Sequence, residues 1–173
     1  FTVNDSTTVG TGSSELTLSG TYASANSATV TGAGNMTIDG AWTLTGTNLA
    51  LTKSGTGTLT INAVTNTTGT GDWNISGGVI NATVTNALNA ADDVIVTGTA
   101  GVPDSTVVNI SGTAGTSGVH QGDDFFIRQG GRVNVAVNNG ISTGTDSLLI
   151  GDTASVGATS AGRLDLAASI NVG

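Results

Sequence analysis

The stretch from Leu49 to Ala82 carries the feature that most constrains how this chain can fold. It contains short groups of alternating apolar and polar residues, which Gly, Asn, Ser and Thr separate. The groups are Leu49-Ala50-Leu51, Leu59-Thr60-Ile61, Trp73-Asn74-Ile75 and Val79-Ile80. Alternation of this kind places one set of side chains on one face of a β-strand, and Gly-rich breaks change the direction of the chain. We therefore predict a series of short strands joined by tight turns.

The composition supports an all-β fold. Only 9% of the 173 residues are charged, against roughly a quarter in typical globular domains. The low charge does not indicate disorder, because the chain is rich in Val, Ile, Leu and Thr and has one Pro. Lys, Glu, Gln and Arg, the usual residues of exposed helix faces, are scarce. The length is enough for one domain, and we predict a single β domain over 1–173.

Most of the predicted strands have only two apolar residues on one face, which is too few to form a stable layer alone. Stacking such strands at a spacing of about 4.8 Å would bury these residues in a continuous column. The spacing of the groups predicts that one turn of three strands takes about 20 to 25 residues. We therefore predict a parallel β-solenoid, along which Thr and Asn side chains can form hydrogen-bonded ladders. An antiparallel β-sandwich of short strands is the alternative.

Two segments are predicted as irregular loops, near 86–93 and 101–124. The first, NALNAADD, is the best candidate for a single helical turn. The second contains Pro103 and His120. His120 is the only histidine, and the chain has no Cys with which it could form a Cys/His pair. We therefore expect His120 to be a loop residue without a catalytic role.

The eleven residues from Leu51 to Ile61, LTKSGTGTLTI, resemble the opening of the autotransporter-associated β-strand repeat, which reads L-x-K-x-G-x-G-T-L-x-L. Thr70–Ile75 and Gly77–Ala82 are similar to the continuation of that repeat. The resemblance covers one copy, from Leu49 to Ala82. It implies a right-handed parallel β-helix on a bacterial cell surface or in extracellular material. It implies no catalytic residues.

The acidic residues are candidates for two kinds of site. Asp92, Asp93, Asp123 and Asp124 could act in glycan cleavage or supply calcium ligands from loops. Adjacent residues on a strand point to opposite faces, so neither pair is a catalytic pair by itself. The chain also lacks a D-x-D-x-D-G run and a repeated calcium-binding nonapeptide. We predict no catalytic site and no cofactor, and we keep these four aspartates as candidates for a structural calcium site.

The aromatic residues are candidates for stacking on sugar rings if they are exposed. Trp42 and Trp73 each begin an alternating triplet that ends in an apolar residue, so we expect both in the core. Tyr22 could stack on a sugar. Phe125 and Phe126 are predicted to face opposite ways, which leaves one of them free for a contact.

The charge excludes several classes of partner. The net charge is −8, and the chain has only four Lys and Arg residues. These cations are too few for nucleic acid or an anionic membrane surface, and no apolar run approaches the roughly 20 residues of a membrane helix. A Thr-, Asn- and Gly-rich chain without Cys is typical of exported bacterial surface proteins. We therefore expect an extracellular or cell-surface protein, either one from which a signal peptide has been removed or an excised fragment of a longer one.

Both ends of the predicted solenoid lack an amphipathic capping helix. Phe1–Val3 and Ala168–Val172 are instead predicted as strands, whose free backbone groups can pair with another copy. The residues predicted to form this assembly interface are Phe1, Val3, Ile170 and Val172. We expect a non-catalytic subunit of an extracellular filament, sheath or surface layer, whose partners are copies of itself. The alternatives are a stalk fragment of an adhesin that binds glycan or a host surface and, less favoured, a polysaccharide-degrading β-helix enzyme.

Overall fold

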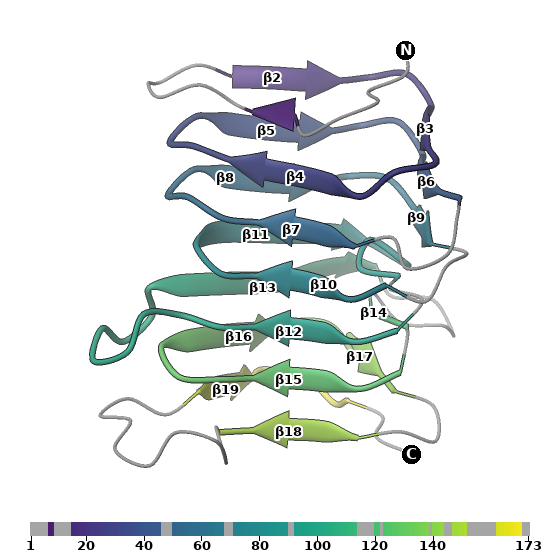
Figure 1. The fold of residues 1–173 in the computed structure, drawn as a ribbon. Coiled ribbons are helices and arrows are strands. Elements are labelled where there is room, and N and C mark those ends of the chain that lie inside the picture. Colours follow the sequence, from purple (N-terminus) through teal and green to yellow (C-terminus); the bar gives the residue numbers. More distant parts are fainter. Residues whose placement is uncertain are drawn as a thin grey trace.

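The computed structural model describes residues 7–8, 15–45, 50–67, 71–89, 92–113, 120–121, 123–138, 140–143, 147–151 and 162–170. These residues form a β-solenoid whose strands pair in parallel, and no helix occurs among them (Figure 1). The front strands of Figure 1 run to the left and the rear strands to the right while the chain descends, so the coil is right-handed. The prediction of an all-β parallel solenoid is confirmed, and the antiparallel sandwich is wrong.

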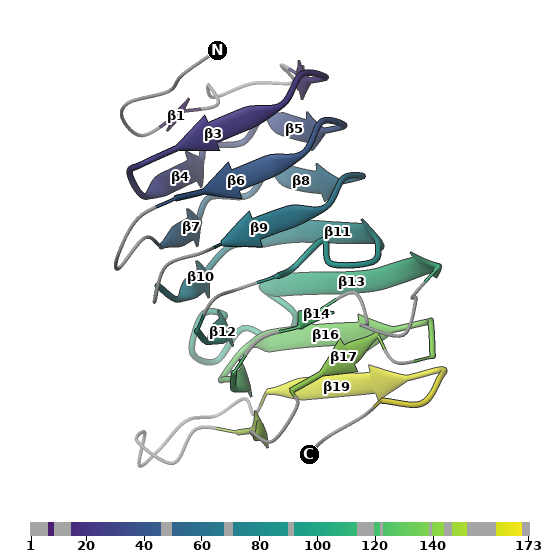
Figure 2. The same ribbon diagram turned by 90° about the vertical axis from the view of Figure 1, so that its right-hand side faces the viewer.

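Two seven-stranded sheets form the long faces of the column. Sheet A consists of β1 (Thr7–Thr8), β4 (Ala28–Thr31), β7 (Leu51–Lys53), β10 (Trp73–Ile75), β12 (Val94–Val96), β15 (Phe125–Ile127) and β18 (Leu148–Ile150). Sheet B consists of β2 (Glu15–Leu18), β5 (Asn35–Ile38), β8 (Thr58–Ile61), β11 (Gly78–Val84), β13 (Thr106–Thr113), β16 (Gly131–Val135) and β19 (Arg163–Leu166). The third face holds sheet C, with β3 (Tyr22–Ser24), β6 (Trp42–Leu44) and β9 (Thr65–Thr67), and lower down the pair β14 (His120–Gln121) and β17 (Ile141–Ser142) (Figure 2).

The register of sheet A confirms the predicted coil length for most of the column. Leu51 lies 23 residues after its partner Ala28, Trp73 lies 22 after Leu51, and Val94 lies 21 after Trp73. Phe125 lies 31 residues after Val94. This longer coil includes an extended corner at 97–105, between β12 and β13, whose residues 99–104 are exposed.

The inward side chains of the three faces fill the interior. Leu51, Trp73 and Phe125 stack in one column of sheet A, and each is at most 1% exposed. Burying an aliphatic or aromatic side chain of this kind stabilises a fold by about 1.5–3 kcal/mol. Trp42 and Trp73 lie in the core, as predicted. Tyr22 is buried as well and packs edge-to-face on Trp42, with the ring centroids 5.5 Å apart, so it cannot stack on a sugar.

Glycines form the tight corner between sheets A and B. Gly32 and Gly55 have positive φ angles of 100° and 81°, which glycine adopts without strain. A Cβ atom at Gly55 would lie 2.5 Å from the backbone nitrogen of Gly32, and one at Gly57 would overlap the carbonyl of Gly34. Adjacent coils can therefore approach to the strand spacing at this corner only because the side chains are missing.

The segment 86–93 contains no helix in its described part, 86–89 and 92–93, so the predicted helical turn is wrong there. One turn hydrogen bond joins the Ala87 nitrogen to the Val84 oxygen at 3.2 Å. The Thr65 nitrogen donates to the Asn86 oxygen at 2.9 Å, which continues the third face beneath β9. Ala87 and Leu88 then fill the core and are fully buried. Pairing with the neighbouring coil and burial of these two side chains outweigh local helix propensity.

The predicted loop over 101–124 is also wrong in part. Residues 106–113 form β13, because Val108 and Ile110 occupy core positions, and residues 120–121 form β14. The last described strand, β19, ends at Leu166. The strand predicted over Ala168–Val172 is wrong in its described part, because residues 168–170 are not in a strand. There the Ser169 nitrogen donates to the side-chain oxygen of Asn138 at 3.2 Å, in place of a backbone acceptor on the next strand.

Candidate functional site

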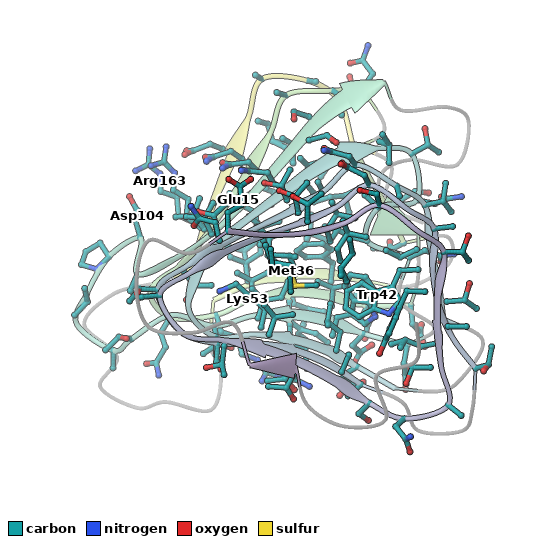
Figure 3. All side chains as sticks on the ribbon, turned by 90° about the horizontal axis from the view of Figure 1, so that it is seen from above. Glu15, Met36, Trp42, Lys53, Asp104 and Arg163 are labelled. Carbon is teal, nitrogen blue, oxygen red and sulfur yellow. The ribbon has the colours of Figure 1, made fainter. Side chains whose placement is uncertain are left out.

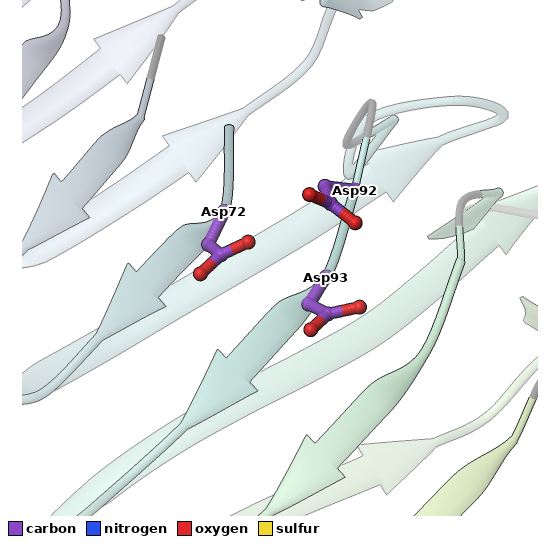
Figure 4. A group of neighbouring side chains, drawn as sticks. All are labelled: Asp72, Asp92 and Asp93. Carbon is purple, nitrogen blue, oxygen red and sulfur yellow. The ribbon is translucent and has the colours of Figure 1, made fainter. Parts of the chain in front are cut away.

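An acidic corner lies at the start of the sheet A strands. Asp72, Asp93 and Asp124 each immediately precede a strand, so the parallel register stacks them one coil apart. Asp92 joins the group from the residue before Asp93. Carboxylate oxygens of Asp72, Asp92 and Asp93 all lie within 4.8 Å of one another, and each residue is half-buried (Figure 4).

The side chains at this corner also tie neighbouring coils together. The Asp124 nitrogen donates to Asp93 Oδ1 at 3.2 Å, and the Ser147 nitrogen donates to Asp124 Oδ1 at 2.6 Å. Higher in the column, the Ala50 nitrogen donates to Ser27 Oγ at 3.1 Å in the same way. An acceptor side chain before a sheet A strand therefore bonds the backbone of the next coil, which gives the aspartates a structural role.

Burial raises the pKa of Asp93 above its ordinary value, and the charges of Asp92, Asp72 and Asp124 raise it further, while the backbone hydrogen bond from Asp124 lowers it. A bound cation would relieve this repulsion. The carboxylates of Asp72, Asp92 and Asp93 supply oxygen ligands of the kind calcium prefers, but fewer than the six to eight it usually takes. A calcium site here stays a prediction.

The structure thus groups two of the four predicted calcium ligands, Asp92 and Asp93, with a residue that the sequence reasoning missed, Asp72. Asp124 lies one coil below Asp93, and exposed Asp123 donates its backbone nitrogen to the Asp92 oxygen at 3.3 Å. One signal could have identified Asp72, because an aspartate precedes the first apolar residue of each strand in Asp-Trp, Asp-Val and Asp-Phe.

The lower end of the column exposes core positions. Ile150 and Leu166 are both 51% exposed, although the residues paired with them one coil above, Ile127 and Val135, are 0% and 1% exposed. At the upper end, residues Leu16 to Tyr22 line an open pocket of about 320 Å³, with Leu16 and Leu18 half-buried. Both ends of the described column therefore present apolar side chains that the next coil would cover.

The structure places only one of the predicted interface residues. Ile170 is half-buried and packs against the core, whereas Phe1, Val3 and Val172 lie outside the described residues. Ile150 and Leu166 were not predicted as interface residues. Their exposure depends on their being in the last strands of sheets A and B, which the alternating pattern does not reveal.

The outer face of sheet B carries the predicted asparagine ladder. Asn109 donates to Asn81 at 2.9 Å, and Asn134 donates to Asn109 at 2.7 Å. Below it, Asp165 accepts hydrogen bonds from Arg132 at 2.7 Å and from Arg163 at 2.9 Å. Burial acts to raise the pKa of Asp165, but these two arginines hold it below its ordinary value.

The lower part of the outer face of sheet A is apolar, whereas the same outward column carries Thr29, Thr52 and Asn74 higher up. Ile95, Phe126 and Leu149 occupy one outward column, and the Arg128 guanidinium lies 5.1 Å from the centroid of the Phe126 ring. Phe125 is fully buried and Phe126 half-buried, so the prediction that these rings face opposite ways is confirmed.

Comparison of the chain with protein-family models, with curated proteins and with solved structures finds no match in any of the three. Within the described ranges, no helix is long and apolar enough to cross a membrane.

Proposed function

We propose that this chain is a non-catalytic structural subunit of an extracellular bacterial filament, sheath or surface layer, and that it joins copies of itself through the open ends of its solenoid. The observation that carries the proposal is the exposure of Ile150 and Leu166 at positions that are buried in the coils above. Edge strands also offer unpaired backbone groups to another chain. A head-to-tail contact that does not close on itself generates a filament.

Leu166→Asp tests this proposal. A charge at the open end would oppose burial by a second copy, so we expect polymers to be lost. The fold should persist, because Leu166 is already 51% exposed. Light scattering and electron microscopy over a concentration series measure the polymers.

Val102→Asp is the matched control, since it introduces the same charge at a residue that is 49% exposed on the corner between β12 and β13. We expect it to polymerise like the unaltered chain. An unaltered chain that stays monomeric at high concentration would contradict the proposal. Antibody labelling of intact cells tests the extracellular location separately.

We also propose that the coil over 51–82 is a copy of the autotransporter-associated β-strand repeat. In support, five of the seven fixed positions of the pattern have a structural role. Leu51, Lys53 and Leu59 point inward, and Gly55 and Gly57 form the tight corner between them. Further copies of the pattern beside this chain in its gene would support the assignment, and their absence would count against it.

A stalk fragment of an adhesin is the second candidate, which the outer face of sheet A favours. Aromatic residues and arginine are enriched at interfaces, and Phe126 and Arg128 lie together on this face. Binding of the purified chain to a glycan array or to host cells, with no polymers at any concentration, would favour this function over the first.

A further inference from the structure

The outermost strands of sheet B carry opposite charges in one column. Glu15, the only glutamate, is in β2 at the top, and Arg163 is in β19 at the bottom. The strand registers place both in the same outward column, which from top to bottom is Glu15, Asn35, Thr58, Val79, Val107, Arg132 and Arg163. Seen along the axis, Glu15 and Arg163 lie on the same side of the molecule (Figure 3).

In the neighbouring columns of sheet B, the residues of the top strand β2 also complement those of the bottom strand β19. Leu16 and Leu18 occupy the inward positions of the top strand, and Leu164 and Leu166 occupy the same two positions of the bottom strand. The outward column between them has Thr17 at the top and Asp165 at the bottom. A hydroxyl can donate a hydrogen bond to a carboxylate, so every position of β2 complements the corresponding position of β19.

We propose that a second copy of this chain docks with its β2 directly below β19 of the first copy, in parallel and in register. This inference rests on the self-assembly proposed above and specifies its geometry. The backbone of Glu15 in the lower copy then lies about 4.8 Å, one strand spacing, from the backbone of Arg163 in the upper copy. Leu16 and Leu18 cover Leu164 and Leu166.

Arg163 has the capacity for this contact. Its side chain is 56% exposed, and its Nε donates to Asp165 at 2.9 Å. A guanidinium has five N–H donors, so it can bind a second carboxylate. Sheet A offers matching edges at the same junction, β18 at the bottom and β1 at the top, so both long sheets can continue into the second copy.

Exchanging the charges of Glu15 and Arg163 distinguishes this junction from other ways in which two copies could join. Glu15→Arg places an arginine against Arg163 of the next copy, and Arg163→Glu places two glutamates together, so each variant alone opposes assembly. We expect the concentration needed for polymers to rise by about tenfold or more in each variant. An equimolar mixture of the two restores opposite charges at every junction, and we expect it to polymerise close to the unaltered concentration.

Two variants control for the change in net charge at residues outside β2 and β19. Asp39→Arg changes the net charge as Glu15→Arg does, and Arg128→Glu changes it as Arg163→Glu does. We expect both to assemble like the unaltered chain. Circular dichroism checks that all four variants are folded, and recovery in the mixture is a result that a folding defect would not give.

Other outcomes overturn the inference in distinguishable ways. If the unaltered chain polymerises and both charge variants do so equally well, self-assembly stands and the register is wrong. If only Arg163→Glu blocks assembly, Arg163 contacts a group other than Glu15 of the next copy, and the proposed register is wrong. If the unaltered chain never polymerises, the proposed function fails together with the junction.

Discussion

A buried lysine is the largest departure from an otherwise apolar column. Lys53 is 1% exposed and is paired in register with Val30 above and Ile75 below, both of which are buried (Figure 3). Its Nζ donates to the carbonyl oxygens of Ser54 at 3.3 Å, Gly55 at 3.2 Å and Gly77 at 3.0 Å. These bonds use all three donors of an ammonium group. The lysine therefore joins two coils at the glycine corner.

The pKa of this lysine makes stability depend on pH. Burial lowers the pKa of Lys53 from its ordinary value of 10.5 to about 8, because desolvation penalises the charged form. Between these values the unfolded chain binds more protons than the folded one, so stability rises with pH. We expect the free energy of unfolding, relative to that of Lys53→Met, to increase from about pH 8 to about pH 10.5.

Urea denaturation at a series of pH values measures this difference. The methionine variant keeps a long apolar side chain that does not titrate. Subtracting its free energy of unfolding at each pH therefore removes the contributions of all other titratable groups. Parallel pH profiles for the two proteins would show that Lys53 is not desolvated in the folded state.

The inward direction of Lys53 follows from the sequence, whereas its burial does not. Lys53 stands two residues after Leu51 and so shares its face. A lysine in a short strand is nevertheless expected at the surface, because burying its charge needs compensating acceptors. One of its acceptors, the Gly77 carbonyl, is 24 residues away, and the spacing of residues within one strand cannot reveal it.

At the scale of the element, the corner between sheets A and B limits which residues can follow a strand. We expect Gly57→Ala to destabilise the fold by about 1–3 kcal/mol, since its Cβ would overlap the Gly34 carbonyl. Gly20→Ala is the matched control, because a Cβ there meets nothing within 4 Å. Chemical denaturation measures both variants. Equal effects would mean that backbone entropy, and not crowding, determines the need for glycine.

The strands themselves were largely predictable, and their partners were not. Leu59–Ile61 and Trp73–Ile75 are strands as predicted, because alternation is a property of adjacent residues. Register depends on the length of each coil, which in sheet A ranges from 21 residues between Trp73 and Val94 to 31 between Val94 and Phe125. The stacking of Asp72 on Asp93 follows from such a coil length, so the acidic corner could be predicted only in part.

At the scale of the whole molecule, we expect local stability to differ between the middle and the ends of the column. In a solenoid each coil contacts only its neighbours. β8 lies between β5 and β11, whereas β19 pairs with β16 alone among the described strands. We expect backbone amides of β8 and β11 to exchange hydrogen most slowly and those of β19 most rapidly in the monomer, because the end strand can open without its neighbours.

Hydrogen exchange below and above the polymerisation concentration measures this gradient. We expect protection to increase at β19 and β2 when copies assemble. Uniform protection along the monomer, or unchanged protection at the ends of the polymer, would contradict the linear arrangement of stability or the use of these ends.

The extended corner at 97–105 has a consequence for any fibre built in this way. The described residues of each copy contribute seven strands to each long sheet, so an equivalent corner recurs about every 34 Å along the fibre axis. Residues 99–104 are exposed, and a short peptide inserted there would be presented as a regular array at a density fixed by the size of one subunit. An insertion that leaves Asp104 in place would keep the ion pairs of this residue with Arg132 in β16 and Arg163 in β19, so the inserted peptide and the strands are encoded by different segments of the chain.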